Sequence, residues 1–133
     1  MPITQTIDPL ARLVLGIGSG ELTLTELATF SRDALRAGLM HYSKLIDVTD
    51  CTPGFTSAEL AVLATVLREN RTDTPRGPLA IVADPHRGEF ARLFTGFEID
   101  GRPAQVFSSI HDARRWLREQ SAPEVARKPG RRL

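Results

Sequence analysis

The sequence predicts an α/β protein in which amphipathic helices alternate with the strands of a mixed, mostly parallel sheet. Two patterns indicate this fold class: short aliphatic runs of strand character, and longer segments whose apolar residues recur with the helical period. The chain of 133 residues is 41% hydrophobic and 25% charged, which is typical of one globular domain. We expect this domain to span residues 1–120, with about five strands and four helices.

The first residues predict an antiparallel β-hairpin. Residues 3–7 alternate threonine with isoleucine or glutamine, a period of two that favours a strand. Asp8-Pro9 marks the turn, and residues 12–17 form the returning strand with aliphatic side chains on one face. Three glycines occupy alternate positions near its end: Gly16, Gly18 and Gly20. Because no helix begins directly after them, we expect a bulged strand end and not a phosphate-binding loop.

Helix starts are marked by capping residues. The four predicted starts are Thr23 with Glu26, Thr56 with Glu59, Asp84-Pro85, and Ser109 with Asp112. Each segment that follows carries an apolar stripe for burial: Leu24, Leu27, Ala28 and Leu35; Leu60, Leu63, Ala64 and Leu67; Phe90, Leu93, Phe94 and Phe97; Ile110, Ala113, Trp116 and Leu117. The strands between them are expected at residues 44–48, 79–83 and 104–107.

Composition excludes several classes of protein. A single cysteine, Cys51, cannot form an internal disulfide, which favours a cytoplasmic protein over a secreted scaffold. No apolar run is long enough to span a membrane, and the polar N-terminus is unlike a secretory signal. The basic surplus is confined to residues 121–133, which we expect to form a flexible tail. Since nucleic-acid binders usually carry a basic folded face, we expect no nucleic-acid partner.

The predicted order of elements resembles the SpoIIAA-like fold of the STAS group (sulfate transporter and anti-sigma-factor antagonist), and most of all its poorly characterised bacterial members. The matching stretches are Gly20-Glu21-Leu22-Thr23, Leu45-Ile46-Asp47-Val48, Thr56-Ser57-Ala58-Glu59-Leu60, Gly77-Pro78-Leu79-Ala80-Ile81-Val82, and Val106-Phe107 followed by Ala113-Arg114-Arg115-Trp116-Leu117. The resemblance implies a SpoIIAA-like α/β domain with an N-terminal hairpin.

In the anti-sigma antagonists, a partner kinase phosphorylates a serine near the start of the helix that follows the Asp-containing strand. The resemblance places that regulatory phosphosite at Ser57, with Thr56 beside it. A phosphate at a helix N-terminus meets free backbone amides and the positive end of the dipole. The alternative is that Thr56 is simply the N-cap of its helix, and N-caps are common.

Polar residues near the ends of the central strands form the candidate ligand or partner loops: Asp47, Thr49, Asp50, Asp84, His86 and Arg87. Asp47 and Asp84 could bind a metal or serve as acid and base. The alternative is that Asp47 holds the following loop by side-chain hydrogen bonds and Asp84 starts its helix. The three histidines and the cysteine lack metal-ligand spacing, so we expect no metal, no cofactor and no catalytic residue.

These observations favour a non-enzymatic binding or regulatory module, with partner contact through residues 49–57. The alternative is a carrier of a small apolar or lipid-like ligand, held between the sheet and the predicted phenylalanine stripe of residues 90–97. A homodimer is the default expectation for a small bacterial domain.

Overall fold

The computed structural model describes residues 3–39, 41–69, 77–86, 88–94, 98–99 and 102–121. Six strands and four helices lie in these residues: β1 Thr4–Asp8, β2 Leu13–Leu22, α1 Leu24–Arg36, β3 Ser43–Pro53, α2 Ser57–Glu69, β4 Leu79–Val82, α3 Glu89–Phe94, β5 Glu98–Ile99, β6 Arg102–Phe107 and α4 Ile110–Ser121. The predicted α/β class and alternation of elements are therefore confirmed, and the two-residue β5 is an addition to the expected strands.

The sheet has the strand order β1-β2-β3-β4-β6-β5. β2, β3, β4 and β6 run parallel, whereas β1 pairs antiparallel with β2 and β5 pairs antiparallel with β6. The expected N-terminal hairpin is thus present. The expected bulge is present too, because the register between β2 and β3 shifts between Ile17 and Ser19, which lie opposite Asp47 and Asp50.

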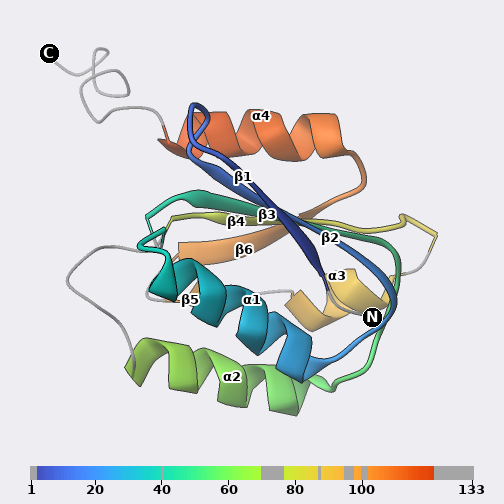
Figure 1. Ribbon diagram of the computed structural model, residues 1–133. Helices are drawn as coiled ribbons and strands as arrows, with labels where there is room; N and C mark the ends of the chain where they lie inside the picture. The colour runs from blue at the N-terminus through green and yellow to red at the C-terminus, as the bar shows by residue number, and fades with distance from the viewer. Residues whose placement is uncertain are drawn as a thin grey trace, which may run out of the picture.

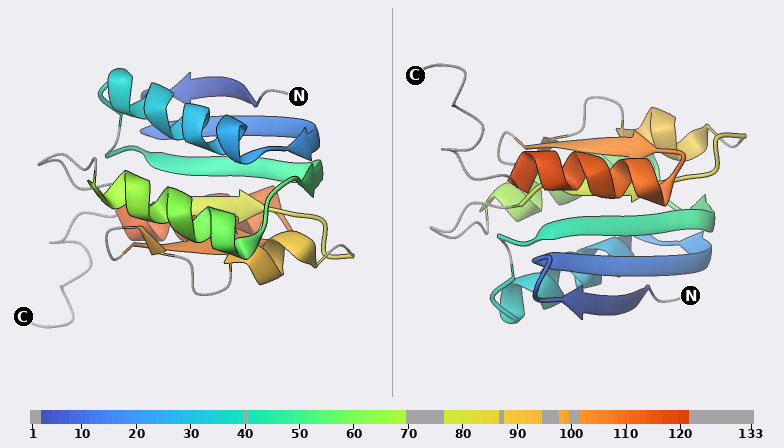
Figure 2. Two further views of the ribbon diagram at one scale, coloured as in Figure 1. Left: turned by 90° about the horizontal axis from the view of Figure 1, so that it is seen from below. Right: turned by 90° about the horizontal axis from the view of Figure 1, so that it is seen from above.

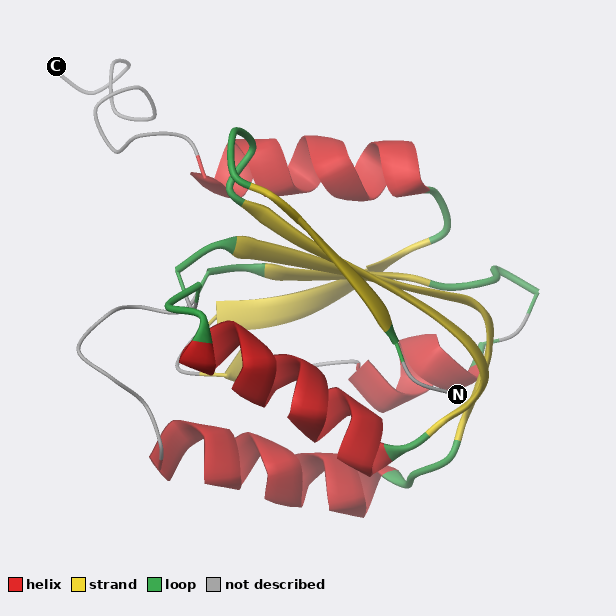
Figure 3. Ribbon diagram, viewed as in Figure 1, coloured by secondary structure: helices red, strands yellow, loops and turns green. Residues whose placement is uncertain are grey.

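The helices cover the sheet unequally. α1, α2 and α3 lie on one face, and α4 lies alone on the other (Figures 1 and 3). Figure 2 shows α4 over the middle of the sheet and β1 at its outer margin. α4 packs against β3, β4 and β6, so the β1–β2 hairpin extends beyond the helix that covers its neighbours.

Alternation along the strands builds one hydrophobic cluster on each face. Ile46 and Ile81 point toward α1, α2 and α3, whereas Leu45, Ala80 and Val82 point toward α4. The larger cluster holds the inward residues of the three helices: Leu27, Phe30, Leu60, Leu63, Phe90 and Phe94. The smaller cluster is closed by Ala113 and Leu117 of α4.

Two glycines shape this packing. A Cβ on Gly16 would lie 2.8 Å from Cε1 of Phe30, so the bare backbone lets α1 approach β2 closely. Gly38 follows the end of α1 with φ of 74°, a left-handed conformation that glycine adopts without strain.

Three boundaries differ from the prediction. β3 continues to Pro53, because residues 50–53 pair with residues 19–22 of β2 across the bulge. Residues 49–53 are therefore strand, and not part of a loop over residues 49–57. α3 begins at Glu89, since Asp84 and the residues after it form a turn. Ser121 still belongs to α4, and residues 122–133 of the expected tail lie outside the described residues, as do Arg87 and Phe97.

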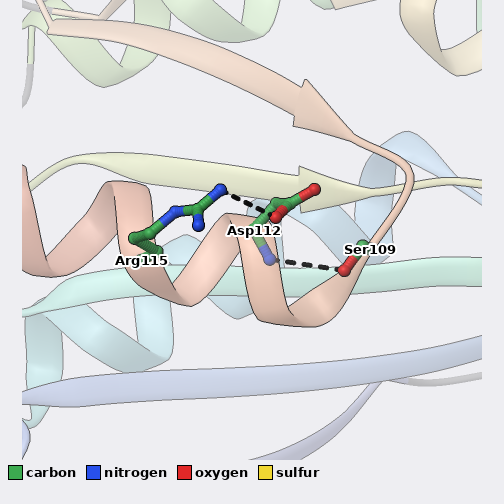
Figure 4. A network of polar contacts seen from close by, with 3 residues as sticks. All are labelled: Ser109, Asp112 and Arg115. Carbon is green, nitrogen blue, oxygen red and sulfur yellow. Dashed lines mark hydrogen bonds and ion pairs between the residues drawn. The ribbon is translucent and has the colours of Figure 1, made fainter.

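The start of α4 also differs from the prediction. Ser109 Oγ accepts a hydrogen bond from the amide of Asp112 at 3.3 Å, as expected of an N-cap. The Asp112 carboxylate instead accepts from Arg115 Nη2 at 3.0 Å (Figure 4), so the cap is not a reciprocal box. Ile110, expected to be buried, is 41% exposed because it begins the helix at the rim of the sheet.

No helix within the described residues has both the length and the apolar character needed to cross a bilayer.

Candidate functional site

The two acidic residues singled out from the sequence lie near the carboxyl end of β4, although Asp47 is within β3, which continues to Pro53. Asp47 lies in register with Val82 of β4, and Asp84 follows two residues later along that strand's direction. Asp47 Oδ1 accepts from the Thr49 amide at 3.0 Å and from the Thr49 hydroxyl at 2.6 Å. The Asp47 carboxylate thus spans the bulge of β3. Asp84 Oδ1 accepts from the His86 amide at 2.9 Å and closes the turn after β4.

These local hydrogen bonds limit what the two carboxylates can do chemically. The carboxylate oxygens already serve as local acceptors, which is the ordinary structural role of aspartate in turns. In the part of the chain that the structure describes, no group of three or more His, Cys, Asp or Glu side chains could hold a metal ion. Thr49, Asp50 and His86 are exposed at this edge of the sheet.

Cys51 lies beside these residues but points into the core. Its side chain is 3% exposed within the larger hydrophobic cluster. Burial raises the pKa of its thiol, and the carboxylates of Asp47 and Asp50 raise it further. A thiol with a raised pKa is a poor nucleophile, so Cys51 acts here as a small packing residue.

The start of α2 separates the roles of two neighbouring hydroxyls. Thr56 Oγ1 accepts from the Glu59 amide at 3.2 Å, while the Thr56 amide donates to Glu59 Oε1 at 2.9 Å. The predicted capping box is therefore formed. Ser57, the first residue of α2, is exposed, and its hydroxyl makes no hydrogen bond to the described residues. An N-cap at Thr56 and a phosphosite at Ser57 are therefore compatible, because Thr56 caps the helix while the Ser57 side chain is exposed.

α2 is apolar on its outer face as well as its inner one. Leu60, Leu63 and Ala64 are buried, yet Val62 is 61% exposed and Val66 is 45% exposed. With the exposed residues around them, these two valines form one continuous stripe at helical spacing, which we call the α2 outer stripe: Ala58, Ala61, Val62, Thr65 and Val66. Ser57 lies one turn before Ala61, so its hydroxyl borders the stripe.

The α2 outer stripe was not predicted, although the sequence carries a signal for it. Between Ser57 and Leu67 the only charged residue is Glu59. A surface helix with one buried face normally carries charges on the other, and α1 and α4 do so through residues such as Arg32, Asp33 and Arg118.

A groove of about 340 Å³ lies at the opposite end of the sheet. It is lined by Ala11, Leu13, Ser43, Arg114, Leu117 and Arg118. Leu13 and Ser43 begin β2 and β3, so the groove sits at the amino ends of the strands and not at the carboxyl ends where ligands were expected. Its lining combines aliphatic residues with two arginines that are one helical turn apart on α4.

The predicted ligand space beside the phenylalanine stripe is occupied by the stripe itself. Phe90 and Phe94 are 2% and 4% exposed, and both belong to the larger core cluster. Phe90 also makes an edge contact with Phe55, with ring centroids 6.5 Å apart. These side chains pack as core.

Comparison with known proteins adds the fold family. No protein-family model and no curated protein matches the chain. A solved structure does: an uncharacterized protein of the DUF3478 family with a SpoIIAA-like fold, from Shewanella loihica. The alignment has a TM-score of 0.57 and covers 87% of this chain and 93% of that one.

The chain has a SpoIIAA-like fold. The sequence identity to the Shewanella protein is 19%, so the likeness establishes the fold and leaves function to the site. For the SpoIIAA-like domain described here, the resemblance first drawn from short sequence stretches is confirmed at the level of the backbone.

Proposed function

We propose that this SpoIIAA-like domain is a non-enzymatic protein-binding module that docks a partner on the α2 outer stripe, with Ser57 at its edge as the regulatory residue. The observation that carries the proposal is the exposure of Val62 and Val66 in a stretch of α2, residues 60–67, that contains no charged residue and lies between the exposed Glu59 and Glu69. Contiguous exposed apolar surface on a small domain commonly marks an interaction site.

The geometry of Ser57 supports a charge-controlled contact. Its side chain is exposed at the first turn of α2, where backbone amides and the helix dipole favour an anion. A phosphoryl group there would add nearly two negative charges beside an apolar stripe. Docking would then require desolvation of that charge, so modification of Ser57 weakens the contact.

The structure offers less support for an enzyme that uses Asp47 and Asp84, or for a carrier with a ligand pocket beside Phe90 and Phe94. Asp47 accepts hydrogen bonds from Thr49 within β3, and Asp84 accepts one from His86 in the turn after β4. Among the described residues, no contact directs the two carboxylates toward a shared ligand. Phe90 and Phe94 fill the core where a carrier would need a cavity. A binding role is therefore the function that the described residues favour.

Affinity capture from a lysate of the source organism tests the proposal. The double variant Val62→Glu/Val66→Glu places two carboxylates on the stripe without touching the buried face of α2. We expect it to lose the partner that the wild-type chain retains, and we expect Ser57→Asp to weaken the same capture.

The matched control is Ile110→Glu, which adds a carboxylate at another exposed apolar residue, at the first turn of α4. We expect it to capture the partner normally. Equal capture by the double variant and the wild-type chain would refute the docking surface, and equal capture by Ser57→Asp and Ser57→Ala would refute the switch.

A further inference from the structure

β1 forms one edge of the sheet, and its single charged residue, Asp8, is the last of the strand. It stands at one end of the strand order and has β2 as its single neighbour among the described strands. Natural edge strands usually carry a charge, a proline or a bulge that prevents pairing with another chain. Residues 3–7 contain neither charge nor proline, and the bulge of this region lies further along, between β2 and β3.

The sequence of this edge is a palindrome. Ile3-Thr4-Gln5-Thr6-Ile7 reads the same in both directions about Gln5. Two copies of such a strand, paired antiparallel about a two-fold axis at Gln5, place like residues opposite each other at every position. Isoleucine then faces isoleucine, threonine faces threonine, and Gln5 faces its own copy.

We propose that two copies of the chain associate through β1 in this register, so that two six-stranded sheets become one continuous sheet. A two-fold antiparallel strand pair is a self-complementary interface, in which each copy supplies the same surface. Cross-strand threonine and aliphatic pairs stabilise antiparallel strands. Asp8 lies outside the palindrome, so the two charged residues at the ends do not oppose one another.

Side-chain placement agrees with the pairing. Thr4 and Thr6 lie opposite Ile17 and Leu15 of β2, and they share the face of the sheet on which α4 leaves the hairpin uncovered. Ile17 is 49% exposed and Ile7 is 43% exposed, on opposite faces of the hairpin. The added strand would cover Ile7 in part, because Ile3 of the other copy lies opposite it. A two-fold axis at Thr6 would instead place Thr4 opposite Asp8 and Gln5 opposite Ile7, so like residues would no longer pair.

Charge exchange at two exposed positions tests the dimer and its register together. In Thr4→Lys/Thr6→Lys, each new lysine opposes a lysine of the other copy, and we expect the dissociation constant to rise at least about tenfold. In Thr4→Lys/Thr6→Glu, each lysine opposes a glutamate, and we expect the dimer to persist. Sedimentation equilibrium measures both against the 14.6 kDa mass of the single chain.

A crosslink supplies a second measurement. Gln5→Cys brings two thiols into direct opposition across the axis, within disulfide reach. Thr6→Cys, the matched control, separates them diagonally and should crosslink at least about tenfold more slowly. The native Cys51 is buried and does not interfere.

Far-UV circular dichroism confirms that each variant folds, as expected because Thr4 and Thr6 are exposed. A wild-type chain that remains a single chain at millimolar concentration would overturn the proposal. So would a dimer that survives the double lysine variant. Loss of the dimer in the lysine–glutamate variant, or equal crosslinking at positions 5 and 6, would overturn the register and with it the palindromic pairing.

Discussion

The two hydroxyls at the start of α2 yield the sharpest stability prediction. Thr56→Ala removes the acceptor of the Glu59 amide, a hydrogen bond of 3.2 Å, and leaves that amide at the helix start without its cap. Loss of an N-cap costs about 1 kcal/mol. For a domain of this size, that cost lowers the melting temperature by roughly 3–5 °C.

Ser57→Ala should behave differently although it lies one residue away. The Ser57 hydroxyl makes no hydrogen bond to the described residues, and the side chain is exposed. Its removal should change the free energy of unfolding by less than about 0.5 kcal/mol. Ser57→Asp should stabilise the helix by about 0.3–1 kcal/mol through the dipole.

Urea unfolding followed by circular dichroism measures all three variants, and equal slopes against denaturant show that only stability has changed. The order of stability should be Thr56→Ala lowest, then Ser57→Ala, then Ser57→Asp. A loss of 1 kcal/mol or more for Ser57→Ala, with Thr56→Ala near the wild-type value, would refute the reasoning, because Ser57 would then be the structural cap.

Three further predictions concern the interior and the first helix. Gly77→Ala should destabilise the fold by about 1–3 kcal/mol in urea unfolding, because a Cβ there would overlap the carbonyl oxygen of Tyr42. The hydrogen bond from the Thr23 amide lowers the pKa of Glu26, so the stabilisation it gives is present at neutral pH and lost as pH falls through that lowered pKa. The stability difference between Glu26→Gln and wild type should therefore shrink in acid, as melting curves at several pH values will measure. Cys51 should react with iodoacetamide at least about tenfold more slowly in the folded chain than in urea, because burial raises its pKa and blocks access.

Each of these three predictions can be contradicted by a specific experimental result. Gly54→Ala is the control for Gly77→Ala, since its Cβ would meet only the flexible side chain of Glu21, and similar losses for both would contradict the backbone clash. A stability difference at Glu26 that is constant across pH would exclude an ionised carboxylate as its cause. Rapid alkylation of Cys51 in the native chain would contradict its burial.

Local chemistry made much of the fold predictable. Thr23 and Thr56 were placed correctly as helix starts because a capping box is formed by residues three apart, and its hydrogen bonds depend on no other element. The core positions of α2 were predicted for the same reason, since Leu60, Leu63 and Ala64 follow the helical period.

Features that depend on distant segments were not predictable in this way. Residues 50–53 lack the pattern of a buried strand, and they are extended because β2 pairs with them beyond the bulge. Asp84 resembles a helix cap in the sequence, but its carboxylate closes a turn with His86 and α3 begins later.

In the candidate site too, local features could be predicted from the sequence, whereas features built from distant segments could not. Ser57 follows from a resemblance in short stretches of sequence, and its regulatory role stays a prediction. The groove at the amino ends of the strands joins Ala11, Ser43 and Arg118 from three separate segments, and only the folded chain brings them together. The apolar residues of the α2 outer stripe can be seen in the sequence, but their exposure depends on which face of the helix the sheet buries.

The most direct test of the docking surface is amide hydrogen exchange of the chain, free and bound to its captured partner. If a partner docks on α2, we expect slower exchange on binding in Ser57–Glu69, strongest around Val62 and Val66, with no change in α4. Protection confined to α4 and the groove beside Arg114 and Arg118, with α2 unchanged, would contradict it.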